Sequence, residues 1–260
     1  MEKFSITANP VGRIIFIHGM KDHCRALPYQ FFIEYFLKRD FEIIRFDLPG
    51  HGFYEGNTWS LGRWDKLQEP CQRALEWANE TRDLPVFIMG INLGGLLALN
   101  TAERFPADVQ GVIAISPALD KKGIPRIYRF LLNGFLPVMS RLSIRFGFNT
   151  PDIARNQEEV AEYIKDPLWE THLTTGFVRA LITGMRETFR NAKKLKMPVL
   201  MLQGGKDKII PPQGGQAFLK RVPSADKTLT TYPDSFHNLF LELNRDEVFA
   251  DIENWMRARC

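Results

Sequence analysis

The sequence predicts an α/β fold in which a mostly parallel sheet is covered by helices on both faces. Two observations lead to this prediction. Several short runs are apolar at consecutive positions, as strands buried on both faces are, and stretches with helical spacing separate them along the chain. The 260 residues, 45% of them apolar, are enough for one large core. We therefore expect a single domain over residues 1–260.

Six runs are expected to form the strands of this sheet. The first five are largely apolar, and the last alternates, which indicates a strand near the edge of the sheet. In chain order the six runs are Arg13–Ile17, Phe41–Asp47, Val86–Met89, Val109–Ile115, Pro198–Leu202 and Thr228–Tyr232.

Helical segments are expected between these strands. Tyr29–Arg39 carries aromatic side chains on one side, and Trp64–Asn79 has an apolar stripe with a 3.6-residue period. Leu96–Phe105 follows the third strand as a further helical stretch. Residues Ala118–Lys196 contain no convincing strand and are too long for a bare loop in a compact domain. We expect this segment, 118–196, to be a helical cap inserted into the domain.

The third strand runs into a turn flanked by glycines, Gly90-Ile-Asn92-Leu-Gly94-Gly95. Glycines two residues either side of a central residue are what a sharp strand-to-helix turn needs, because a Cβ atom there would clash. In the usual pattern, G-x-S-x-G, the central residue is a nucleophilic serine raised above the sheet. In this chain the central residue is Asn92.

Polar and glycine residues follow four of the predicted strands at their carboxyl ends, where functional groups gather in open parallel sheets. In chain order these residues are His18, Gly19 and Met20, then Asn92, Asp207 and His237. The order of nucleophile position, acid and histidine is that of α/β-hydrolases. In such a triad the acid orients the imidazole, which takes the nucleophile's proton and later gives it to the leaving group. Backbone N–H groups of Met20 and Leu93 are expected to form the oxyanion hole.

Motifs along almost the whole chain resemble those of monoacylglycerol lipase and lysophospholipase-type α/β-hydrolases. The stretches that carry the resemblance are His18–His23, Asp47–Gly52, Gly90–Gly95, Leu202–Asp207 and Phe236–His237, together with Ala154–Tyr163 and Asp166–Leu168 in the predicted cap. The resemblance implies hydrolysis of monoacylglycerols, lysophospholipids or similar acyl esters. It also implies that neither an organic cofactor nor a metal takes part.

The resemblance assigns a role to each candidate residue. Asn92 stands at the nucleophile position, His237 is the general base and Asp207 orients it. His18 and Gly19 belong to the oxyanion loop that faces the substrate. Only twelve residues precede the first predicted strand, where the family has room for an N-terminal hairpin, so edge strands are expected to be lacking.

Three explanations of Asn92 are open, because a carboxamide is not a useful nucleophile at neutral pH. It is an inactivating substitution in an otherwise competent enzyme, or the natural residue of a non-catalytic relative that binds an acyl ligand or a protein. In the third, His237 activates water directly or Asn92 deamidates to an aspartate. Removing the serine of a triad costs on the order of a million-fold in turnover.

The charge and composition of the chain limit the classes of binding partner that we expect. The net charge of +4 is too small to indicate nucleic acid, and no nucleic-acid motif is present. Six basic residues and no acid lie within Lys121–Phe148. Those charges are either solvated on a cap whose apolar residues pack inward, or they contact an anionic membrane surface. His23 has no neighbouring ligand cluster, so a metal site is not expected.

The cysteines and the hydropathy predict a cytoplasmic protein. Cys24, Cys71 and Cys260 are odd in number and widely spaced, which makes a disulfide framework unexpected, and Cys24 is expected to be a buried, inert thiol. Met1–Pro10 lacks the apolar core of a signal peptide. No stretch approaches the ~18 apolar residues of a transmembrane segment.

Two geometric predictions follow from the assignment. His237 should lie within hydrogen-bond distance of both Asp207 and the side chain of Asn92. A pocket should run from Asn92 under the cap, lined mostly by apolar cap residues.

Overall fold

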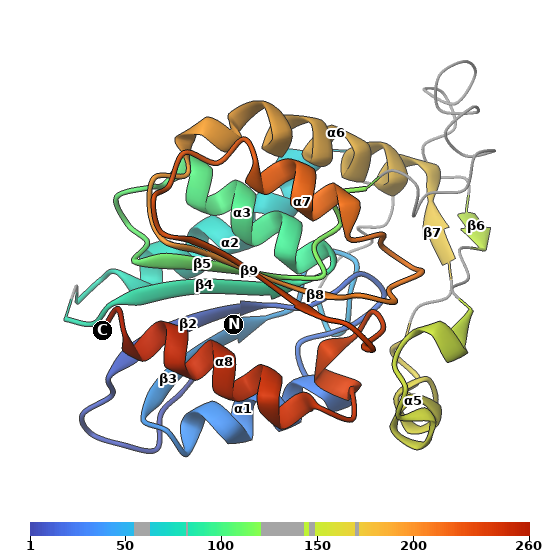
Figure 1. Cartoon of the computed structure of the whole chain (residues 1–260), viewed down its shortest axis with the longest axis horizontal. Helices are drawn as coiled ribbons and strands as arrows, with labels where there is room; N and C mark the ends of the chain where they lie inside the picture. Colours follow the sequence, from blue (N-terminus) through green and yellow to red (C-terminus); the bar gives the residue numbers. More distant parts are fainter. Residues whose placement is uncertain (55–62, 82, 121–142, 146–148, 170–171) are drawn as a thin grey trace.

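The computed structural model describes residues 1–54, 63–81, 83–120, 143–145, 149–169 and 172–260, with backbone alone for 143–145 (Figure 1). One seven-stranded sheet has the strand order β1-β3-β2-β4-β5-β8-β9. All neighbouring strands are parallel except β1, which pairs antiparallel with β3. Its strands are β1 (Glu2–Phe4), β2 (Gly12–Ile17), β3 (Phe41–Phe46), β4 (Val86–Ile91), β5 (Gly111–Ile115), β8 (Val199–Gly204) and β9 (Lys227–Tyr232).

Helices cover both faces of this sheet, as the sequence predicts (Figure 1). One face is covered by α1 (Leu27–Leu37) and α8 (Arg245–Arg257). The other face is covered by α2 (Trp64–Ala78), α3 (Leu93–Arg104), α6 (Thr175–Asn191) and α7 (Gln213–Leu219). Because of this double cover, every residue of β2, β4, β5 and β8 is buried. β9 lies at the edge and is mostly exposed, which confirms its predicted place.

Aromatic packing fixes the layer of α1 and α8 against the sheet. The ring of Phe32 on α1 stacks on Phe240, with centroids 5.4 Å apart, and Phe16 of β2 lies 4.7 Å from Phe32. Phe240 belongs to a short 3-10 helix, η5 (Leu239–Leu241), and packs edge-on against Phe249 of α8. The loop that carries His237 is therefore anchored on the core directly after the histidine.

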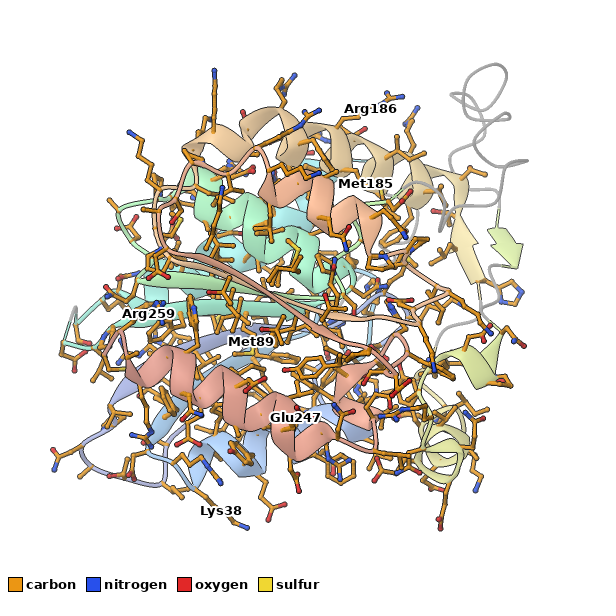
Figure 2. All side chains as sticks on the ribbon, viewed as in Figure 1. Lys38, Met89, Met185, Arg186, Glu247 and Arg259 are labelled. Atoms are coloured by element: carbon orange, nitrogen blue, oxygen red, sulfur yellow. The ribbon has the colours of Figure 1, made fainter. Side chains whose placement is uncertain are left out.

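The opposite helix layer shows the same division between inward apolar and outward charged side chains. Met89 lies in the interior of the sheet, and Met185 on α6 faces inward at 2% exposure (Figure 2). Its neighbour Arg186 points to solvent. α6 packs on α3 and α2, so this helix belongs to the layer over the sheet although it lies within the segment 118–196.

Two strand predictions were wrong. The N-terminal residues do form an edge strand, because Glu2–Phe4 pairs with Ile43, Ile44 and Arg45 of β3. The segment 118–196 does contain strands: β6 (Ser143–Arg145) and β7 (His172–Thr174) form a two-stranded antiparallel sheet. Each of these strands is three residues long, so neither carries a period that sequence could reveal.

The part of the predicted cap that is described lies beyond the carboxyl ends of the parallel strands (Figure 1). It consists of β6, β7, α5 (Gln157–Tyr163) and a 3-10 helix, η3 (Thr150–Asp152). A further 3-10 turn, η4 (Ala192–Lys194), follows α6. The basic segment Lys121–Phe148 lies outside the described residues apart from the backbone of β6. Among the helices described, none is long and apolar enough to cross a membrane.

Candidate active site

The turn between β4 and α3 raises Asn92 above the edge of the sheet. Asn92 has φ 53° and ψ −112°, a backbone conformation that L-residues rarely adopt. A Cβ atom on Gly90 would lie 2.2 Å from the carbonyl carbon of Gly94, and one on Gly94 would lie 2.0 Å from the carbonyl oxygen of Ile17. Only glycine fits at either position, so the chain can pass β2 and enter α3 through this strained residue.

The side chain of Asn92 is hydrogen-bonded at both ends and only 4% exposed. Its Nδ2 lies 2.8 Å from Nε2 of His237, and its Oδ1 accepts a bond of 2.7 Å from the N–H of Leu93. An amide nitrogen donates, so Nε2 of His237 accepts and the imidazole proton resides on Nδ1. The amide of Asn92 is therefore hydrogen-bonded both to His237, the expected general base, and to the N–H of Leu93, one of the expected oxyanion donors.

His237 is held from its other ring nitrogen by Asp207. Nδ1 donates to Oδ2 of Asp207 at 2.7 Å, and Oδ1 of Asp207 accepts from the N–H groups of Ile209 and Ile210, each at 2.8 Å. Both side chains are more than nine-tenths buried. The carbonyl of His237 accepts from Oγ of Ser116 at 2.8 Å, which ties its loop to the end of β5. The predicted contacts of His237 with Asp207 and Asn92 are present.

The residues of the loop after β2 differ in whether they line the cavity beside Asn92. Gly19 and Met20 line the cavity beside Asn92. His18 does not: its ring is fully buried, with Nε2 accepting from Leu48 N–H at 2.9 Å and Nδ1 donating to the carbonyl of Gly19 at 2.8 Å. Burial lowers the pKa of His18 to about 4, so the ring is neutral and braces the two loops.

A carboxylate and two tyrosines connect this loop to the cap, and sequence reasoning gave them no role. The N–H of Gly19 donates to the hydroxyl oxygen of Tyr29 at 3.0 Å, and Tyr29 donates in turn to Asp22. Tyr163 of α5 donates to the other oxygen of Asp22. Asp22 is 5% exposed, and burial raises its pKa to about 6 against the two tyrosine donors. The position of Gly19 is thus linked to the position of α5.

Three consecutive residues of the loop hold the cap over the site. The ammonium of Lys21 lies 5.0 Å from the ring centroid of Trp169, a cation–π geometry. Asp22 accepts from Tyr163, and Nε2 of His23 bonds Oδ2 of Asp166 at 2.8 Å. We call these three contacts the cap latch. On the far side, the N–H of Asn238 donates to the carbonyl of Ile153 at 2.7 Å.

The cavity at Asn92 is small, with a mainly apolar lining. It encloses about 30 Å³, which is close to the space of one water molecule. Its walls from the cap are Ile153, Tyr163 and Trp169, and polar groups of Asp22 and His237 also face it. The described residues therefore enclose only this small space where a pocket under the cap is predicted, and Tyr163 and Trp169 form part of its wall.

Among the described residues, no cysteine lines the cavity at Asn92. Cys24 is 3% exposed and does not line the cavity at Asn92, and burial raises its thiol pKa to about 12. All three cysteines are unpaired in the structure. Among the described residues, no group of three or more His, Cys, Asp or Glu side chains is arranged to hold a metal ion.

Comparisons with known proteins agree with this fold. A family model described as serine aminopeptidase, S33, matches residues 8–244. Human monoglyceride lipase is 28% identical over 262 residues, which cover 97% of this chain and 84% of the human protein. Phospholipase YtpA of Bacillus subtilis is 26% identical over 246 residues, covering 92% of this chain and 93% of that protein. The crystal structure of a Paleococcus ferrophilus monoacylglycerol lipase has a TM-score of 0.90 at 27% identity, covering 100% of this chain and 98% of that one.

The matched region begins before β2 and runs past His237, so it contains the strained turn and the Asp207–His237 pair. The architecture is that of the structural relative over the whole chain. The chain therefore belongs to the serine aminopeptidase S33 family of α/β-hydrolases, whose members similar to it include ester hydrolases of the monoacylglycerol lipase and phospholipase type.

Proposed function

We propose that this chain is a carboxylic-ester hydrolase scaffold for lipid-like acyl esters, blocked at the nucleophile position by Asn92. The observation that carries the proposal is the chain of hydrogen bonds Asp207–His237–Asn92, built on a strained strand-to-helix turn of the kind that a nucleophile elbow has. The monoacylglycerol lipases and the phospholipase among its relatives supply the substrate class.

A serine at position 92 would complete an acyl-transfer mechanism. Its Oγ would attack the ester carbonyl while Nε2 of His237 takes the proton, and Asp207 would stabilise the imidazolium. The N–H groups of Leu93 and Met20 would bind the oxyanion, each donor being worth roughly 3–4 kcal/mol. The alcohol would leave with the proton from His237, and water would then release the acid by the same route.

Asn92 interferes with this sequence in two ways. It supplies no attacking atom at neutral pH. Its amide also engages the Leu93 N–H and the Nε2 of His237, both of which the reaction needs free. The same contacts disfavour direct activation of water by His237, because the basic nitrogen already accepts a hydrogen bond.

Substrate entry requires the cap to move. A cavity of about 30 Å³ does not hold an acyl chain. We infer that the cap latch opens when a substrate or ligand enters, as lids do in many enzymes. The proposal also includes an inserted cap at 118–196 and a cytoplasmic location. It further includes contact of the basic segment Lys121–Phe148 with anionic membranes. Equal sedimentation of the protein with neutral and anionic vesicles would rule out this membrane contact.

The competing proposal is a non-catalytic protein that binds an acyl ligand or a protein partner. It is favoured by the hydrogen bonds of Asn92, whose amide has a partner in the site at both its nitrogen and its oxygen. In that case the Asp207–His237 pair acts as a structural support for the turn.

A paired hydrolysis assay separates the two proposals. The chain and its Asn92→Ser variant are compared on a short p-nitrophenyl ester and on a monoacylglycerol. We expect the chain to be inert and the serine variant to turn over both esters, with Asn92→Ala as the matched inactive control. Absence of turnover in a folded serine variant would contradict the hydrolase proposal and favour the binding protein.

A further inference from the structure

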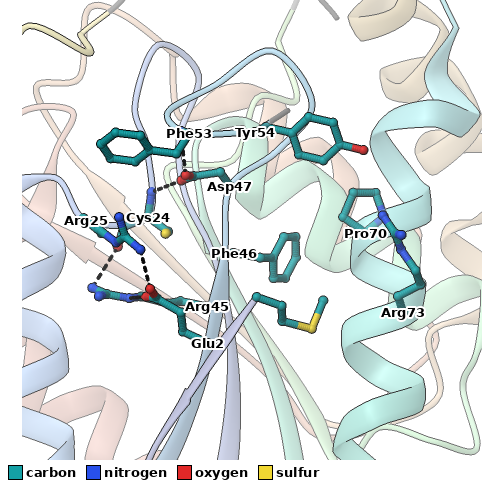
Figure 3. A pocket seen from close by; sticks show the side chains of 11 residues that line it. Glu2, Cys24, Arg25, Arg45, Phe46, Asp47, Phe53, Tyr54, Pro70 and Arg73 are labelled. Atoms are coloured by element: carbon teal, nitrogen blue, oxygen red, sulfur yellow. Dashed lines mark hydrogen bonds and ion pairs between the residues drawn. The ribbon is translucent and has the colours of Figure 1, made fainter. Parts of the chain in front are cut away.

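A second and much larger cavity lies beside the loop that follows β2 (Figure 3). It has a volume of about 580 Å³, within the range of small-molecule sites. Its wall includes Cys24 and Arg25 of that loop, Phe46 at the end of β3, and Pro70 and Arg73 of α2. None of the residues that line it lines the cavity at Asn92.

Most charges in this wall neutralise one another. Glu2 bridges two arginines, with Arg45 Nε donating to it at 2.9 Å and Arg25 donating to its other oxygen. The two oxygens of Asp47 accept from the N–H groups of Cys24, at 2.7 Å, and Phe53, at 2.9 Å. Both carboxylates are therefore hydrogen-bonded within the wall, Glu2 to two arginines and Asp47 to two backbone N–H groups.

Arg73 is the arginine of this wall that has no carboxylate partner among the described residues. It is exposed on α2, across the cavity from the Glu2 cluster, and makes no ion pair with a described residue (Figure 3). The five charged side chains of the wall, three arginines and two carboxylates, sum to one positive charge. One excess charge in a concave site favours a monoanion, and a guanidinium matches the two oxygens of a carboxylate.

Among the uncharged side chains of the wall, Phe46, Phe53 and Pro70 are apolar, and Tyr54 adds a phenol hydroxyl. Phe46 forms a buried surface between the two charged sides, and the ring of Phe53 is 63% exposed at the rim (Figure 3). An apolar chain placed along the ring of Phe53 would remove its exposed surface from water, whereas Phe46, which is 3% exposed, offers only a packing contact. The arrangement of one unpaired cation beside an apolar wall selects an amphipathic anion over a small inorganic one.

We propose that this cavity is a second binding site, for an amphipathic carboxylate whose head group pairs with Arg73 and whose apolar chain covers Phe53 and Phe46. The binding does not depend on the proposed hydrolytic function. Cys24 and Arg25 share a loop with Gly19 and Met20, so a bound carboxylate contacts the same loop at residues that do not line the cavity at Asn92. An acid of this kind is also the product that hydrolysis of an acyl ester releases.

Titration calorimetry with sodium decanoate, below its micelle concentration, tests the site on the full chain. Acetate has the same head group without the chain, and decyltrimethylammonium has the chain with the opposite charge. We expect decanoate to bind at least tenfold more tightly than either. Arg73→Gln should weaken decanoate binding about tenfold, the loss of one charge-assisted pair. Arg186→Gln, an exposed arginine on α6, is the matched control and should leave it unchanged.

A second variant tests the apolar wall. Phe53→Ala removes an exposed ring and should weaken decanoate binding several-fold without changing the melting temperature. Absence of decanoate binding to the unchanged chain would overturn the proposal. So would equal binding by the Arg73→Gln and Arg186→Gln variants, or binding of decyltrimethylammonium as tight as that of decanoate.

Discussion

Glu103 is a buried carboxyl group whose replacement should change how stability depends on pH. It lies on α3, is 1% exposed, and neither of its oxygens accepts a hydrogen bond from a described residue. Burial raises its pKa from 4.5 to about 9, with repulsion by Glu187 adding to the shift and Lys194 opposing it. The folded protein therefore keeps Glu103 protonated at neutral pH, whereas the unfolded chain does not.

The sign of the effect follows from proton binding. Between pH 4.5 and about 9 the folded state holds a proton that the unfolded state has lost. The stability that this proton represents is complete below the unfolded pKa and is lost as pH rises through the folded pKa. The slope is at most about 1.4 kcal/mol per pH unit, so Glu103 lowers the free energy of unfolding by about 2–3 kcal/mol between pH 6 and pH 8.

Urea denaturation at pH 6 and pH 8 measures this difference. The Glu103→Gln variant keeps the shape of the side chain and cannot ionise. From pH 6 to pH 8, its free energy of unfolding should therefore fall by about 2–3 kcal/mol less than that of the unchanged chain. Glu158→Gln, an exposed glutamate on α5, is the control and should follow the unchanged chain. If the Glu103→Gln variant and the unchanged chain lose stability in parallel, the assignment of a protonated Glu103 is refuted.

Three further substitutions probe the turn and the cap latch. Gly94→Ala places a methyl group 2.0 Å from the carbonyl oxygen of Ile17 and should destabilise the fold by at least about 3 kcal/mol; an unchanged melting temperature would contradict this. Tyr163→Phe removes the donor to Asp22 and should lower the free energy of unfolding by about 1–3 kcal/mol, measured in urea; a value equal to that of the unchanged chain would show that the contact contributes nothing. Asp166→Asn replaces the carboxylate that is hydrogen-bonded to His23, so backbone amides of residues 163–169 should exchange hydrogen faster. Identical exchange would mean that this bond does not hold the cap.

The sheet could be predicted from sequence because its central strands are buried on both faces. Runs such as Arg13–Ile17 and Val86–Met89 are apolar at nearly every position, and burial of β2 and β4 is complete. The edge strand β1 could not be found in this way. Its three residues, Glu-Lys-Phe, have no apolar pattern, and they become a strand because β3 offers an unpaired edge.

The candidate site could be predicted for the residues whose position is set by the strand that precedes them. Asn92, Asp207 and His237 each follow a strand whose carboxyl end meets the others at one edge of the sheet, so order along the chain was sufficient. The contact of Asp22 with Tyr163 joins residues 141 positions apart, across the cap. No local pattern sets that distance, which is why neither this contact nor the small cavity beneath it could be predicted.

Labelling with a fluorophosphonate tests the central claim most directly, because the reagent reports a serine activated by its histidine without requiring a particular ester. The serine oxygen attacks phosphorus and fluoride leaves, which adds one phosphonyl group to the intact mass. We predict that Asn92→Ser gains one such group at position 92, and that neither the unchanged chain nor the double variant Asn92→Ser/His237→Ala does. A folded Asn92→Ser variant that stays unlabelled, or labelling of the chain with Asn92 in place, would contradict the account.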